Sequence, residues 1–153
     1  MFADFSSCRY VVVDIQGFNV GKEFVAKALA VVGPTGEVLD NFILKPPVPL
    51  HTVSPKTFDQ QRYEEVNIHG IPWEEGTIPY ATATQHLMKS LGRCKIIVVK
   101  GHQKEAWLKE ILPHKFKILN IEPHGPKMQK SAHYFSSCIN NAIAIRKFIK
   151  NVN

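Results

Sequence analysis

An aspartate interrupts an otherwise apolar segment near the start of the chain. Residues 11–18 read VVVDIQGF, with Asp14 between two β-branched residues. A buried carboxylate is costly unless a partner compensates its charge. Two acids at positions i and i+2 would point to the same side of a strand, where they could bind one divalent cation. The second of these positions holds Gln16, so only one of the two charges is present.

Further residues with carboxylate, imidazole or thiol side chains lie in the second half of the chain. Glu105 follows an apolar run within KGHQKEAWL (100–108), and His133 precedes Cys138 by five positions at the expected start of the last helix. Mg²⁺ and Mn²⁺ prefer oxygen ligands, so the soft sulfur of Cys138 suits them poorly. Lys104, next to Glu105, would repel a cation if it turned inward.

The hydrophobic pattern predicts an α/β fold that could position these residues. The turn sequence GPTG at 33–36 joins two apolar runs, which indicates an antiparallel hairpin. The run KIIVV at 95–99 is typical of a buried parallel strand. The expected strands are 9–15, 23–32, 37–44, 95–99 and 116–121, and the expected helices are 80–91, 103–112 and 131–149. We expect a mixed five-stranded sheet, with three antiparallel strands followed by two parallel ones, flanked by helices.

A proline-rich crossing at 45–55 and a short helix after Ser54 complete the predicted elements. The length of 153 residues suits one domain over residues 1–153. We see no secretory signal and no apolar stretch of the roughly 20 residues that a membrane span requires. Three cysteines far apart favour a reducing compartment. We therefore expect an intracellular protein, cytoplasmic or nuclear, that does not contact membranes.

Positive charge is concentrated in the second half of the chain. Residues 89–153 hold 13 of the 19 lysines and arginines but only 3 of the 13 acids. Such asymmetry is typical of a surface that meets a polyanion, although lysine also serves simply as a solubilising residue. The basic residues that we expect to contact RNA or single-stranded DNA are Lys100, Lys104, Lys127, Lys130 and Arg146.

Three strands followed by helix–strand–helix–strand–helix is the element order found in ribonuclease-H-like folds. Four local motifs indicate one family among the proteins with this fold. They are Asp14-Ile15-Gln16 in the first strand, His69-Gly70-Ile71 after the proline-rich crossing, Glu105 after the fourth strand, and His133-x4-Cys138 at the last helix. In order and position they match the Asp-x-Glu, His-Gly-Ile, His-Asn-Ala-x-Phe-Asp and His-x4-Asp motifs of one family. Over nearly its whole length, the chain resembles the DEDDh 3′–5′ exonucleases.

This resemblance implies a nuclease site in which two Mg²⁺ or Mn²⁺ ions and a histidine activate water. The resemblance implies that five positions are the remnant of this site: Asp14, Gln16, Glu105, His133 and Cys138. Gln16 and Cys138 replace two of the family's acids, so we expect a degenerate member without exonuclease activity and without a cofactor. Its function would be to bind RNA, single-stranded DNA or a protein. Two alternatives stay open. One is a working metal-dependent 3′–5′ exonuclease or ribonuclease that uses Asp14, Glu105 and His133. The other is a pure protein-interaction scaffold.

The chain is also similar in kind to the Maelstrom domain, a ribonuclease-H-like relative that lacks the family's acids and binds zinc near its last helix. Four residues around the expected start of the last helix form a loose set of zinc ligands: Glu122, His124, His133 and Cys138. Their spacing differs from the paired ligands of structural zinc sites, so histidines in a solvated loop are the alternative.

Overall fold

The computed structural model describes residues 10–20, 23–47, 72–122 and 134–152, and the side chains of the last segment from Ile139 to Ile149. The strands are β1 (Tyr10–Val20), β2 (Glu23–Val32), β3 (Val38–Ile43), β4 (Ile96–Val99) and β5 (Lys117–Asn120). The helices are a 3₁₀ turn, η4 (Tyr80–Thr82), followed by α3 (Ala83–Leu91), α4 (His102–Ile111) and α5 (Tyr134–Val152). The predicted helix after Ser54 and the His69-Gly70-Ile71 motif lie outside the described residues.

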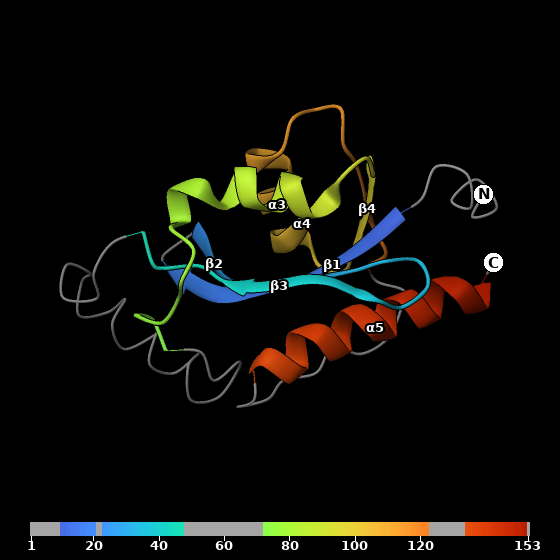
Figure 1. Cartoon of the computed structure of the whole chain (residues 1–153), viewed down its shortest axis with the longest axis horizontal. Coiled ribbons are helices and arrows are strands. Elements are labelled where there is room, and N and C mark those ends of the chain that lie inside the picture. Colours follow the sequence, from blue (N-terminus) through green and yellow to red (C-terminus); the bar gives the residue numbers. More distant parts are fainter. Residues whose placement is uncertain (1–9, 21–22, 48–71, 123–133, 153) are drawn as a thin grey trace.

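The five strands form one mixed sheet with the order β3-β2-β1-β4-β5 (Figure 1). β1 pairs with β2, and β2 with β3, in antiparallel orientation. β4 pairs with β1 and with β5 in parallel orientation. This arrangement confirms the predicted α/β class and the predicted succession of three antiparallel strands and two parallel ones.

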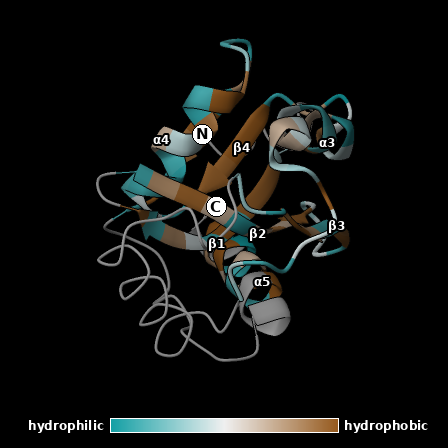
Figure 2. Cartoon of the chain, turned by 90° about the vertical axis from the view of Figure 1, so that its left-hand side faces the viewer, coloured by the Kyte–Doolittle hydropathy of each residue, from teal (hydrophilic) through white to brown (hydrophobic). Residues whose placement is uncertain are grey.

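Helices cover both faces of the sheet. In Figure 1, α3 and α4 lie on one side of the strands and α5 lies on the other. The alternation along β1 divides the core accordingly. Val11, Val13 and Ile15 pack in the cluster that includes α3 and α4, whereas Tyr10 and Val12 pack with α5. The uniformly hydrophobic colour of β4 in Figure 2 agrees with a strand that is buried on both faces.

Strand β1 is longer than predicted, so Asp14 and Gln16 lie within the strand and not at its end. The ladder between β1 and β2 continues to the pair Val20 and Glu23 because a bulge absorbs a change of register after Gln16. Gln16 pairs with Ala28 and Gly17 with Ala26, which leaves Lys27 without a counterpart. Gly17 is required here, because a Cβ atom at this position would lie 2.2 Å from the carbonyl oxygen of Val25.

The turn between β2 and β3 confirms the predicted hairpin. The Gly33 N–H donates to the Glu37 carbonyl at 2.8 Å, and Gly36 closes the turn with a φ of 91°. Gly36 tolerates this left-handed conformation because it has no Cβ atom.

The predicted helix 80–91 is divided into η4 and α3. The Thr82 N–H bonds to the Pro79 carbonyl at 3.0 Å, which gives the first turn 3₁₀ geometry.

In the described part of the chain, no helix is long and apolar enough to cross a membrane.

Candidate functional site

Asp14 is fully buried and lies at the centre of a polar cluster between the sheet and two helices. Its Oδ1 atom accepts a hydrogen bond from the Lys104 ammonium at 2.8 Å. Its Oδ2 atom accepts from the side-chain amides of Asn141 at 3.2 Å and Gln16 at 3.3 Å. The side chain of Asp14 is 0 % exposed and that of Lys104 is 17 % exposed. The cluster therefore satisfies a buried carboxylate with one cation and two neutral donors.

The order of the elements explains why Lys104 reaches Asp14. The pairing of β1 with β4 ends at Val12 and Val98, so Asp14 lies beyond the carboxyl end of β4. Helix α4 begins three residues after β4 and carries Lys104 in its first turn. Open α/β sheets commonly place their functional groups at this end of parallel strands.

Asn141 approaches Asp14 from the opposite helix, α5. It shares a stripe at i, i+4 and i+8 with Ile145 and Ile149, and all three side chains are buried. We did not predict this contact from the sequence. A polar residue on an otherwise apolar helical stripe was the available signal, because a buried amide needs a hydrogen-bond partner.

Glu105 lies next to Lys104 in the sequence but has different partners. Its carboxylate accepts from Asn120 Nδ2 at 3.0 Å and from the Lys109 ammonium at 2.8 Å. These two hydrogen bonds, Lys109 first, lower the pKa of Glu105 below its ordinary value. Asn120 also accepts from the Gly101 N–H at 3.1 Å. Glu105 thus helps to hold the start of α4 against the end of β5.

The remaining predicted ligands are only partly described. His124 and His133 lie outside the described residues, as does the side chain of Cys138. Glu122 is described, and its N–H donates to Asn120 Oδ1 at 2.9 Å. Within residues 10–20, 23–47, 72–122 and the described side chains of α5, no three His, Cys, Asp or Glu side chains gather closely enough to hold a metal ion.

Three of the five predicted nucleic-acid-binding residues are described, and they lie directly after β4, on α4 and on α5. Lys104 is engaged with Asp14, and Lys100 is partly buried directly after β4. Arg146 lies on α5 and donates from Nε to the Pro34 carbonyl at 3.0 Å, in the turn between β2 and β3. Lys127 and Lys130 lie outside the described residues. Lys104 and Arg146 therefore bind other parts of the protein.

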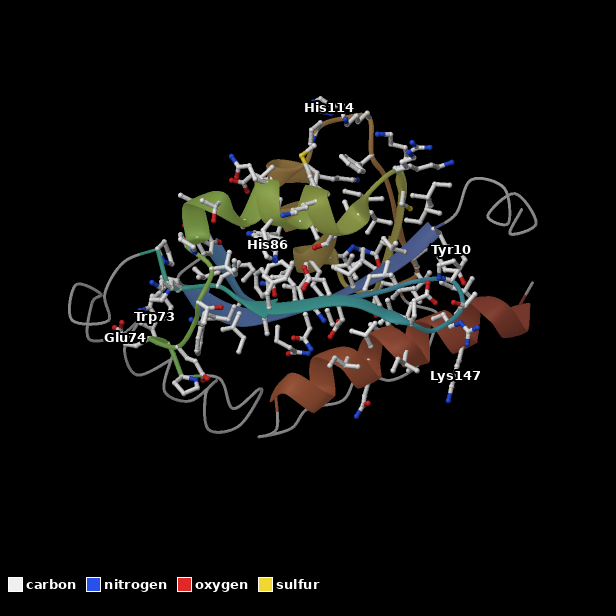
Figure 3. The ribbon with its side chains drawn as sticks, viewed as in Figure 1. Tyr10, Trp73, Glu74, His86, His114 and Lys147 are labelled. Atoms are coloured by element: carbon white, nitrogen blue, oxygen red, sulfur yellow. The ribbon has the colours of Figure 1, made fainter. Side chains whose placement is uncertain are left out.

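A second buried cation, Lys27, was not singled out from the sequence. Its side chain is fully buried at the bulge in β2. Its ammonium donates to the backbone carbonyls of Leu44 at 2.7 Å, Trp73 at 2.8 Å and Glu75. Trp73 and Glu74 lie at the end of the molecule away from Tyr10 (Figure 3). A single lysine within the apolar run EFVAKALAVV was the available signal, since lysine is almost never buried unless it is paired.

Burial also changes the protonation of Lys27, and this leads to a prediction. Desolvation lowers its pKa from 10.5 to about 8, although Glu75 and Glu74 oppose the shift. Between these pH values the native state has lost a proton that the unfolded chain still holds, so the free energy of unfolding rises with pH. We expect wild type to gain about 2 kcal/mol relative to Lys27→Met between pH 8 and pH 10 in urea titrations. Equal pH profiles for the two proteins would contradict this assignment.

A serine, a histidine and an aspartate also meet between α3 and β3, but not as a catalytic triad. His86 Nε2 lies 3.1 Å from Asp40 Oδ2, and the Ser90 hydroxyl donates to the same carboxylate oxygen. In a hydrolase the histidine stands between the serine and the aspartate, so that it can accept the serine proton. Here the carboxylate stands between them. Figure 3 shows His86 between α3 and the sheet. Its contacts with Asp40 and with the ring of Phe42 join α3 to β3.

The chain was compared with known proteins. No protein-family model matches it, and no curated protein matches it.

Proposed function

We propose that this protein is a catalytically silent domain of the ribonuclease-H-like fold, related to the DEDDh exonucleases, that binds single-stranded RNA or DNA. The element order supports the proposed relationship. Three strands are followed by α3, β4, α4, β5 and α5, as expected of that fold. Asp14 lies in β1, where the first motif of the family is expected, and β1 is the central strand of the sheet.

The contact between Lys104 and Asp14 is the observation on which the loss of catalysis depends. A two-metal nuclease needs several carboxylates free to bind cations. In this protein the ammonium of Lys104 lies 2.8 Å from the Asp14 carboxylate and supplies the positive charge that a metal would otherwise supply. A metal ion would have to displace this ammonium, and among the described residues Asp14 is the one carboxylate of this cluster. Gln16 adds no charge, and Glu105 is held by Asn120 and Lys109.

Charge supports the binding half of the proposal. Residues 89–153 carry a strong excess of lysine and arginine, and this half of the chain supplies β4, α4, β5 and α5. A phosphate backbone is the polyanion for which such an excess is typical. Binding without cleavage is the activity that remains when the fold and the positive surface are kept and the metal ligands are lost.

We expect no cleavage of end-labelled single-stranded RNA or DNA by the purified protein with Mg²⁺ or Mn²⁺. The measurement is a time course on denaturing gels, run beside Asp14→Asn as a matched control that lacks the carboxylate. The two proteins should give identical, background-level traces. Cleavage by wild type that Asp14→Asn abolishes would overturn the proposal and establish the active-nuclease alternative.

The binding half is tested separately, by fluorescence anisotropy with the same oligonucleotides at low and physiological salt. We expect weak, sequence-tolerant binding that falls steeply as salt rises, because released counterions supply the driving force. Absence of binding at low salt would exclude nucleic acid, and the protein-scaffold alternative would replace it.

A further inference from the structure

Two exposed lysines lie together at the amino ends of β4 and β5, the end of these strands opposite to Asp14. Lys95 directly precedes β4, and Lys117 is the first residue of β5. The Lys117 N–H donates to the Lys95 carbonyl at 2.7 Å, but Lys117 is in register with Ile96, so the side chains of Lys95 and Lys117 point to opposite faces of the sheet. Lys115 lies two residues before Lys117. We name the exposed pair Lys95 and Lys115 the β4–β5 basic patch.

The aromatic ring of Phe116 brings these two cations together. The Lys95 ammonium lies 5.3 Å from the centre of the ring, and the Lys115 ammonium lies 5.6 Å from it. Both distances are within the range of cation–π contacts. The pKa of Lys95 is lowered, first by partial desolvation and then by the nearby Lys115 charge. Like charges held this close favour the binding of an anion.

The described acids do not neutralise the patch. The ion pairs among the described residues join Asp14 to Lys104, Asp40 to His86 and Glu105 to Lys109. None of them includes a residue of the β4–β5 basic patch. An external anion would therefore meet these cations without displacing a described internal partner.

A small hollow adjoins the patch between the end of α4 and β5. Its volume is about 170 Å³, and its lining is mainly apolar with two basic side chains: Leu112, Pro113, Phe116 and Ile118, with Lys109 and His114. Typical pockets for drug-sized ligands exceed roughly 300 Å³, so this one suits a single flat group. Phe116 belongs both to the hollow and to the patch. A site for negative charge thus lies directly beside a site for one apolar ring.

We propose that the β4–β5 basic patch binds the phosphates of a single-stranded nucleic acid, with one unpaired base in the adjoining hollow. Phosphates next to a flat, largely apolar base are the chemistry that these two neighbouring features match. An acidic peptide or an anionic lipid surface offers the charge without that ring. The inference rests on the binding half of the proposed function. It assigns the contact to the amino ends of the strands, away from Asp14.

Charge reversal tests this assignment. Wild type, Lys95→Glu/Lys115→Glu and a control, Lys45→Glu/Lys147→Glu, are titrated against a labelled single-stranded oligonucleotide. The control changes the net charge by the same amount as the patch variant. It uses two other exposed lysines, Lys45 before the Pro46–Pro47 pair and Lys147 on α5. Figure 3 shows Lys147 on α5, on the other side of the molecule from His114. We expect the patch variant to bind at least about tenfold more weakly at low salt and to lose about 1.4 from the log–log salt slope, since each single-strand phosphate contact contributes about 0.7. The control should lose much less than this.

Further measurements separate the outcomes. Circular dichroism checks that both variants fold, and Lys95→Gln/Lys115→Gln replaces the charge reversal if the patch variant does not fold. A duplex of the same sequence should bind more weakly than the single strand, because its bases are paired; equal or tighter duplex binding overturns the proposal. If the patch and control variants lose the same affinity for the oligonucleotide, the protein binds nucleic acid but not at the β4–β5 basic patch. No binding by wild type at low salt overturns both. Patch-dependent binding to anionic vesicles without oligonucleotide binding identifies a lipid surface and also overturns the proposal.

Discussion

Replacing Lys104 with methionine is expected to lower the free energy of unfolding by about 3 kcal/mol, because it leaves the charge of a buried carboxylate without its cation. Asp14 is 0 % exposed and would keep the amides of Gln16 and Asn141, but not the ammonium at 2.8 Å. Methionine preserves most of the aliphatic length, so the loss reports on charge more than on packing. Urea denaturation followed by circular dichroism measures it.

Lys109→Met is the matched control, since Lys109 is also on α4 and also contacts a carboxylate. Its side chain is 60 % exposed and its partner Glu105 is an i, i+4 neighbour. Such a pair contributes about 0.3–0.5 kcal/mol at most. The double variant Asp14→Asn/Lys104→Met should be more stable than Lys104→Met alone, because no unpaired charge remains. Equal effects of Lys104→Met and Lys109→Met would show that Lys104 does not compensate the Asp14 charge.

Replacing Lys27 with methionine is also expected to destabilise the protein, by about 3 kcal/mol at pH 7. Buried ion pairs can sometimes be exchanged for apolar residues without loss, because both partners are removed together. The partners of Lys27 are instead the backbone carbonyls of Leu44, Trp73 and Glu75, which no side-chain substitution removes. Each carbonyl left without a donor costs about 1–3 kcal/mol. This loss is partly offset because the variant no longer has to bury an ammonium.

The effect of Lys27→Met should be strongest where the segment around Trp73 meets β2 and β3. Hydrogen exchange should accelerate at the amides of Thr77 and Ile78, which bond to the Ile43 carbonyl, and much less in α5. Lys45→Met, an exposed lysine nearby, is the control and should change stability by less than about 0.5 kcal/mol. A Lys27→Met protein as stable as wild type would show that the three hydrogen bonds contribute no net stability.

The elements of the sheet could be predicted from the sequence because their signals are local. The turn GPTG at 33–36 specified a hairpin, and the four-residue core of β4 was too short and too apolar for anything but a buried strand. The extension of β1 to Val20 could not be predicted in this way. It depends on a bulge opposite Gln16 and Gly17, and therefore on how two strands pair.

The sequence by itself determined that Asp14 needs a partner, because a carboxylate among β-branched residues in a strand is too costly to bury alone. It also placed Lys104 where an inward turn would oppose a metal ion. Only the tertiary structure decided that Lys104 does turn inward. The ladder of β4 ends two residues short of Asp14, and the first turn of α4 fills the space beyond it. Asn141 and Lys27 acquired their roles in the same way, since their partners lie 127 and up to 48 positions away in the chain. Hydrogen bonds over such separations depend on how helices and strands pack, which the residues flanking a position do not specify.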